Sequence, residues 1–101
     1  MRIELLHIDE CPNWAQCSER IQAALDVVGV RDVTIGHYLL TDPAGAARVD
    51  FGGSPTILID GVDAFPGVRT NDLACRIYQT EHGLAGMPTT TQIEEAIRAR
   101  L

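Results

Sequence analysis

The chain has 101 residues, a length that allows one hydrophobic core and one domain, which we place at residues 1–101. Hydrophobic residues make up 46% and charged residues 22%, as in an ordinary globular protein. The net charge of −6 excludes a basic surface for nucleic acid and an electrostatic hold on an anionic membrane. We expect no membrane association and a cytoplasmic location, because no apolar run reaches the ~20 residues of a membrane span and MRIE does not resemble the start of a signal peptide.

The first half of the chain predicts the order strand, helix, strand, helix. Residues 2–8 (RIELLHI) carry apolar side chains on both faces, as in a strand that is buried on two sides. Apolar residues recur every three or four positions over about 13–28, which indicates an amphipathic helix. The β-branched and aromatic stretch 32–40 predicts a second strand, and Asp42 caps a short, weak helix that ends near Val49.

The second half predicts two strands and a last helix. TILI at 56–59 is the third strand, and 62–72 is rich in Pro, Gly, Asn and Asp, which indicates a loop. Residues 74–80 fit a strand or a short helix, and we favour the strand. The last helix is capped by Thr90 or Thr91. The order β-α-β-α-β-β-α predicts an α/β fold with a parallel first pair of strands and helices on both faces of a small mixed sheet.

The chain contains three cysteines, an odd number that does not indicate a disulfide framework in a reducing compartment. Cys17 lies on the apolar stripe of the first helix, so we expect it in the core. It is also six residues after Cys11, about 9 Å along a helix, which is too far for a disulfide. Cys75 follows apolar Leu73 and Ala74, which favours a buried cysteine, although a reactive role stays open.

Two segments resemble the thioredoxin superfamily. CPNW at 11–14 lies between the first strand and the first helix, where thioredoxins and glutaredoxins carry Cys-Pro-x-Cys or Cys-Gly-Pro-Cys. GSPT at 53–56 opens the third strand, as the cis-proline loop of the family does. The resemblance covers most of the chain, is weakest over 62–85, and is closest to small bacterial thioredoxin-like proteins that share the CPNW and GSPT segments. It implies a thioredoxin-like fold and thiol chemistry.

The first motif departs from the family because Trp14 replaces the second cysteine. The resemblance therefore implies that Cys11 alone holds the nucleophile position. Cys75 is a candidate resolving thiol on other grounds, because Arg76 follows it directly and could favour its thiolate if the two side chains converge. The resemblance also implies that Ser54, Pro55 and Thr56 align the substrate backbone. Trp14, at the first turn of the predicted helix beside Cys11, could supply a flat contact for a ligand, although packing in the core is the larger expectation. A cis bond before Pro55 would leave the backbone of Ser54 free to pair with an extended thiol peptide or a glutathione-like backbone.

Cys11 stands at the predicted N-terminus of a helix, where the helix dipole and free N–H groups stabilise a thiolate. The carboxylates of Asp9 and Glu10 oppose this effect. We expect a modest lowering of the Cys11 pKa, because the helix end is fixed whereas the two carboxylates can point into water.

Three functions remain open on the sequence. The first is thiol–disulfide exchange or thiol carrying through Cys11, with a low-molecular-weight thiol or a protein thiol as partner and no cofactor. The second is a non-enzymatic binding or adaptor module, which the missing second cysteine favours. The third and weakest is soft-metal binding by Cys11 and Cys75. We expect no dedicated metal site, since Cys11 and Cys17 lack zinc-finger spacing and the three histidines lie in different elements.

Overall fold

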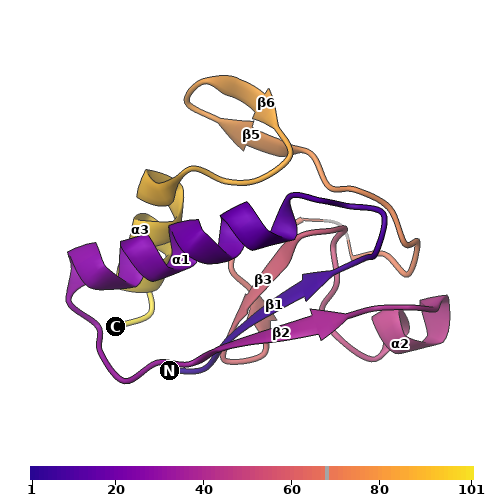
Figure 1. Ribbon diagram of the computed structural model, residues 1–101, viewed down its shortest axis with the longest axis horizontal. Helices are drawn as coiled ribbons and strands as arrows, with labels where there is room; N and C mark the ends of the chain where they lie inside the picture. Colours follow the sequence, from indigo (N-terminus) through magenta and orange to yellow (C-terminus); the bar gives the residue numbers. More distant parts are fainter. Residues whose placement is uncertain (68) are drawn as a thin grey trace.

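The structure is a computed structural model that describes residues 1–67 and 69–101. It contains a four-stranded sheet in the order β2-β1-β3-β4 (Figure 1). β2 runs parallel to β1, β3 runs antiparallel to β1, and β4 runs antiparallel to β3. The predicted α/β class and the mixed sheet with a parallel first pair are therefore confirmed. The four strands are β1 (Ile3–His7), β2 (Ile35–Leu39), β3 (Thr56–Ile59) and β4 (Val62–Asp63).

β1 lies between β2 and β3, and its side chains enter two separate hydrophobic clusters. Ile3 and Leu5 belong to the larger cluster, whereas Leu6 and the following Ile8 belong to the smaller one. All four side chains are buried. Since successive residues of a strand point to opposite faces, the two clusters lie on opposite faces of the sheet, as the apolar run RIELLHI predicts.

Helices cover both faces of this sheet. α1 (Trp14–Val28) and α3 (Thr90–Arg98) pack against each other and contribute to the larger cluster (Figure 1). α2 (Pro43–Ala47) contributes the buried Ala46 to the smaller cluster. No helix in the described part of the chain has the length and apolarity needed for a membrane crossing.

The N-cap of the last helix lies one residue before the first of the two predicted caps. Thr89, rather than Thr90 or Thr91, is the N-cap, and its hydroxyl accepts the backbone N–H of Gln92 at 3.2 Å. The Gln92 side chain accepts the backbone N–H of Thr89 at 2.9 Å in return, which completes a capping box. Thr89 is the N-cap because Gln92 lies three residues after it, so that the Gln92 side chain can accept the backbone N–H of Thr89.

The strand prediction for residues 74–80 is correct only at its end. β5 (Tyr78–Thr80) pairs antiparallel with β6 (Gly83–Ala85), and this hairpin stands apart from the four-stranded sheet (Figure 1). The fourth strand of the sheet is instead β4, inside the predicted loop 62–72; Val68 of that loop lies outside the described residues. A strand of two residues is too short to leave a periodic pattern in the sequence. β4 is also fixed by a residue outside the strand, because the Asp50 carboxylate accepts the N–H of Asp63 at 2.8 Å.

Candidate functional site

Cys11 lies in the turn between β1 and α1, where it is 1% exposed and packs in the smaller cluster. Its backbone N–H donates to the carbonyl of Ile8 at 3.3 Å, which closes the turn. Its Sγ donates to the carbonyl oxygen of Ser54 at 3.5 Å, and the Ser54 hydroxyl accepts the N–H of Ile8 at 3.1 Å. Ser54 therefore holds both ends of this turn against the start of β3.

Ser54 itself is fully buried, and its peptide bond to Pro55 is cis. The backbone N–H of Ser54 donates to the carbonyl of Ala74, and its carbonyl accepts the N–H of Arg76, both at 2.8 Å. The expectation that the Ser54 backbone is free to pair with a substrate is wrong for this structure. The chain's own segment Ala74–Arg76 occupies both groups.

The same pairing brings Cys75 to Cys11. Cys75 forms a parallel β-bridge with Ser54 and is exposed, so the expectation of a buried cysteine at this position is wrong. Interaction with the Cys11 thiol is the main reason why the pKa of Cys75 lies above its ordinary value. Partial burial and the negative charges of ionised Cys11 and of Glu10 act in the same direction. Two thiols far apart in the sequence therefore meet beside the Ser54 carbonyl.

Arg76 fixes the segment that carries Cys75. Its guanidinium pairs with the carboxylate of Asp63 at 2.7 Å, and the two side chains are only 10% and 8% exposed. The guanidinium also donates to the carbonyl of Phe65 and lies over the ring of Tyr78, 4.6 Å from its centroid. The Tyr78 hydroxyl in turn donates to the carbonyl of Pro55. These contacts tie the segment to β4 and to the start of β3.

Two glycines make room for this segment. A Cβ atom on Gly52 would lie 2.8 Å from Nη1 of Arg76, and one on Gly53 would lie 2.8 Å from the Cβ of Arg76. Gly53 also has φ of +109°, a backbone conformation that disfavours side chains. From the sequence the pair Gly52-Gly53 predicts only a turn. The structure adds that Gly53 leaves room for the close approach of the Arg76 backbone, whereas Gly52 meets only the ends of the Arg76 and Asp63 side chains.

Pro55 and Thr56, implied as substrate-binding residues, are both buried. The Thr56 hydroxyl donates to the carbonyl of Gly53 at 2.5 Å and accepts the N–H of Gly52 at 3.1 Å. It thereby shapes the loop that presents the Ser54 carbonyl to the Cys11 thiol and to the backbone N–H of Arg76.

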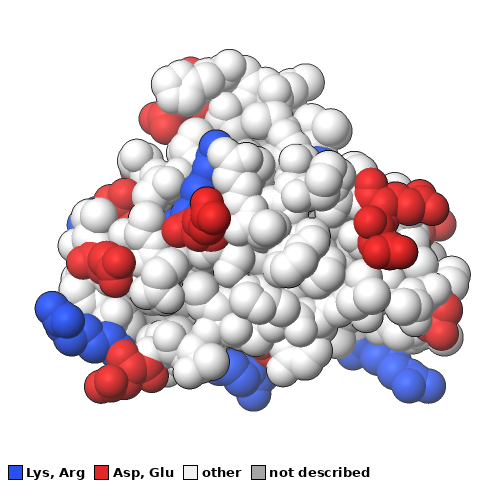
Figure 2. Space-filling view, in the orientation of Figure 1, with Lys and Arg blue, Asp and Glu red and all other residues white. Residues whose placement is uncertain are grey.

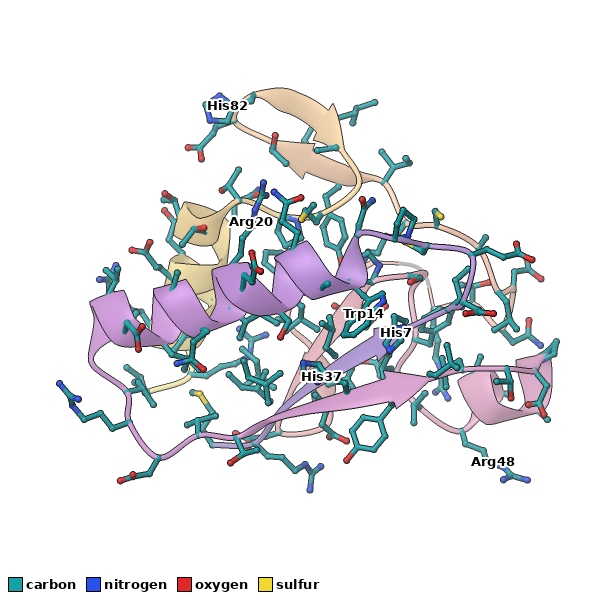
Figure 3. The ribbon with its side chains drawn as sticks, in the orientation of Figure 1. His7, Trp14, Arg20, His37, Arg48 and His82 are labelled. Carbon is teal, nitrogen blue, oxygen red and sulfur yellow. The ribbon has the colours of Figure 1, made fainter. Side chains whose placement is uncertain are left out.

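Trp14 lies apart from the cysteine pair, on the larger cluster. Its indole stacks on the imidazole of His7 at 4.4 Å between ring centroids and meets His37 edge-on at 5.5 Å (Figure 3). Burial lowers the pKa of His7 below its ordinary value, and His7 Nδ1 is buried without a hydrogen-bond partner among the described residues. Cys11 packs in the other cluster, so the structure does not bring Trp14 into the group formed by Cys11, Ser54 and Cys75.

Cys17 is in the core, as predicted. It is fully buried in the larger cluster beneath α1, and burial raises the pKa of its thiol to about 12. A thiol with such a pKa is almost entirely protonated near neutral pH, so Cys17 is chemically inert there.

Sequence reasoning missed the residues that hold the site together. Asp63, Arg76 and Tyr78 lie within residues 62–85, where the resemblance is weakest, and the sequence predicts a role only for Arg76, as the neighbour of Cys75. A usable signal was the arginine beside a cysteine, since a cation near a thiol often marks a reactive site. In the structure Asp63 neutralises the charge of Arg76, and the ion pair fixes the position of the segment that carries Cys75.

Acidic side chains gather near the turn from β1 to α1 on the face shown in Figure 2. Asp9 and Glu10 of this turn are both exposed.

No group of three or more metal-ligating side chains occurs among residues 1–67 and 69–101. No family model, no curated protein and no solved structure matches the chain.

Proposed function

We propose that this chain is a thioredoxin-like thiol protein in which Cys11 and Cys75 form a redox pair. The observation that carries the proposal is that both cysteines lie against Ser54: the Cys11 thiol donates to its carbonyl oxygen, and Cys75 forms a β-bridge with it. The thioredoxin-like assignment is supported by the strand order β2-β1-β3-β4, by the parallel pair that α1 connects, and by the position of Cys11 at the turn before α1. A cytoplasmic location, where such a pair begins reduced, belongs to the same proposal.

The Cys11–Cys75 pair takes the place of the dithiol of the family motif, in which Trp14 stands at the position of the second cysteine. In our proposal the reduced pair reacts with an external disulfide in two exchanges. One thiol of the pair attacks as its thiolate, forms a mixed disulfide and releases one external thiol. The second thiolate then attacks that mixed disulfide, which releases the other external thiol and leaves a Cys11–Cys75 disulfide. Two protons and two electrons pass from the pair to the two released thiols.

In our proposal Cys75 makes the first attack, because its thiol is the accessible one of the pair. Cys11 is 1% exposed, so a disulfide larger than the thiol itself cannot reach its sulfur without local opening, whereas Cys75 is exposed. Cys11 is placed for the second attack because it and Cys75 both lie against Ser54. The raised pKa of Cys75 lowers its thiolate fraction at neutral pH, so the first exchange is slow there and accelerates as the pH rises.

The test is to treat the reduced protein with hydroxyethyl disulfide and map the products by mass spectrometry. We expect an internal Cys11–Cys75 disulfide in the wild type, a stable mixed disulfide on Cys75 in Cys11→Ser, and little reaction in Cys75→Ser. Cys17→Ala is the control, because it removes the third thiol without placing a hydroxyl in the core, and it should form the internal disulfide as the wild type does. Failure of the wild type to form the internal disulfide would contradict the proposal.

A second candidate is a non-enzymatic binding module of the same fold, in which the two cysteines only pack. The observations that favour it are the burial of Cys11 and the occupation of the Ser54 backbone by the chain's own segment. In that case Cys75 should react with hydroxyethyl disulfide no faster than N-acetylcysteine does, and its adduct should persist without attack by Cys11.

A further inference from the structure

The surface that recognises a substrate must lie away from Ser54. Both backbone groups of Ser54 are bonded to Ala74 and Arg76, and the residue is fully buried. An incoming peptide could pair with Ser54 only by displacing a segment that the buried Arg76–Asp63 ion pair holds. A substrate for the redox pair therefore has to dock beside the exposed Cys75.

A hollow of about 550 Å³ lies beside Cys75 and is lined by Phe65, Pro66 and residues 75–79 among others. We call it the Cys75 hollow. Its space is far larger than a thiol, so it can hold side chains that flank a substrate sulfur. Ile77, 66% exposed, is the most accessible apolar side chain on its wall. The hollow thus joins an exposed thiol to apolar surface within reach of the same ligand.

The charges around the hollow disfavour an acidic ligand. The cation on its wall, Arg76, is already paired with Asp63 and bonded to the Phe65 carbonyl, so it offers little to an incoming carboxylate. Glu10 is close enough to act on the Cys75 thiol, and the chain as a whole carries a net charge of −6. Glutathione disulfide, which is negatively charged at neutral pH, meets repulsion on this approach.

We propose that the Cys75 hollow binds a peptide segment whose disulfide cysteine is flanked by an apolar side chain, so that the substrates are protein or peptide disulfides rather than glutathione disulfide. This inference rests on the proposed redox function and adds its substrate class. The apolar side chain packs against Ile77 and its neighbours. The Cys75 thiolate attacks the peptide sulfur, the peptide disulfide breaks, and Cys11 then releases the bound peptide thiol by forming the Cys11–Cys75 disulfide.

The test compares three disulfides: the dimer of acetyl-Phe-Cys-amide, the dimer of acetyl-Glu-Cys-amide, and hydroxyethyl disulfide as the small neutral reference. The rate of Cys11–Cys75 disulfide formation is followed by acid quenching and mass spectrometry. Each rate is divided by that of N-acetylcysteine with the same reagent, which removes differences in intrinsic reactivity. We expect the normalised rate for the Phe peptide to exceed that for hydroxyethyl disulfide roughly tenfold, as burial of one large apolar side chain allows. The Glu peptide should fall below hydroxyethyl disulfide.

Two surface variants locate the effect. Ile77→Ser removes the apolar wall and should abolish most of the preference for the Phe peptide over hydroxyethyl disulfide. Leu84→Ser is the matched control, because Leu84 is equally exposed, at 71%, but does not line the hollow. It should leave all three rates unchanged.

The outcomes separate this inference from the function on which it rests. If hydroxyethyl disulfide yields no internal disulfide, the proposed redox function fails. If it does, but the Phe peptide has no advantage or Ile77→Ser and Leu84→Ser change the rates alike, the substrate assignment alone is overturned.

Discussion

Arg76 donates its backbone N–H to the carbonyl oxygen of Ser54 at 2.8 Å, and the same oxygen accepts the Cys11 thiol at 3.5 Å. One acceptor therefore sets the position of Cys11 and of the residue next to Cys75. The distance between the two thiols depends on groups that carry no sulfur, so changes at these groups should alter both stability and exchange.

Arg76→Ala should be strongly destabilising. It leaves the carboxylate of Asp63 buried without its cation, and breaking one partner of a buried pair costs roughly 3–5 kcal/mol of unfolding free energy. The freed segment should also separate Cys75 from Cys11 and slow formation of the internal disulfide. Urea unfolding and the hydroxyethyl disulfide assay measure the two effects.

The control for this variant is the pair Asp63→Asn and Arg76→Gln, made singly and together. The double variant should be more stable than the sum of the single changes indicates, because neither partner is then left charged and alone. Additive single and double variants, or a normal exchange rate in folded Arg76→Ala, would show that Arg76 does not position Cys75.

Gly53→Ala should perturb the site through its close approach to Arg76. The positive φ costs about 1–2 kcal/mol for a residue with a side chain. The new Cβ would also lie 2.8 Å from the Cβ of Arg76, and such overpacking adds about 1–3 kcal/mol. Gly83→Ala is the matched control, since Gly83 has φ of +97° but no atom within 4 Å of a new Cβ. Equal losses of stability in the two variants would argue against the close contact.

Much of the fold could be predicted because its signals are local. Each of three segments can be predicted from its own residues alone: the apolar run of β1, the apolar stripe of α1 and the Gly-Ser-Pro loop before β3. Cys17 was assigned correctly for the same reason, as its neighbours on the helix are apolar. The N-cap at Thr89 was missed by one residue because three threonines follow one another and only the partner Gln92 distinguishes them.

The site could be predicted only in part because it depends on a long-range pairing. Cys11 has a local signal at a helix start, but nothing near Cys75 shows that its segment crosses to Ser54. The apolar residues before Cys75 suggested burial, and Leu73 does pack against the smaller cluster. Cys75, two residues later, emerges at its edge and is exposed. Short-range patterns do not resolve where such a segment leaves the core.

The three cysteines should react with iodoacetamide in a fixed order. In the folded protein at pH 8 we expect Cys75 to be labelled first, Cys11 slowly because it is buried, and Cys17 not at all, since its pKa of about 12 and its burial both protect it. Peptide mapping at timed intervals gives the order. In urea all three should react at similar rates. Early labelling of Cys17 in the folded protein would contradict its place in the core.

The stability of the fold should fall as the pH drops below about 6.5, in part because of His7. Burial lowers the pKa of His7 in the folded state, whereas the unfolded chain keeps the ordinary value of about 6.5. As the pH falls, the unfolded state takes up the proton first, so the unfolding free energy decreases until the folded-state pKa is passed. One such proton gives a slope of at most about 1.4 kcal/mol per pH unit.

His7→Phe separates this titration from the other acid-sensitive groups, because phenylalanine keeps a ring against Trp14 but carries no proton to exchange. Urea unfolding from pH 8 to pH 5 should show a shallower decline for the variant than for the wild type. The difference at pH 8, where His7 is neutral in both states, measures the change in packing alone. Parallel stability curves for the two proteins across this range would show that the burial of His7 against Trp14 does not oppose its protonation.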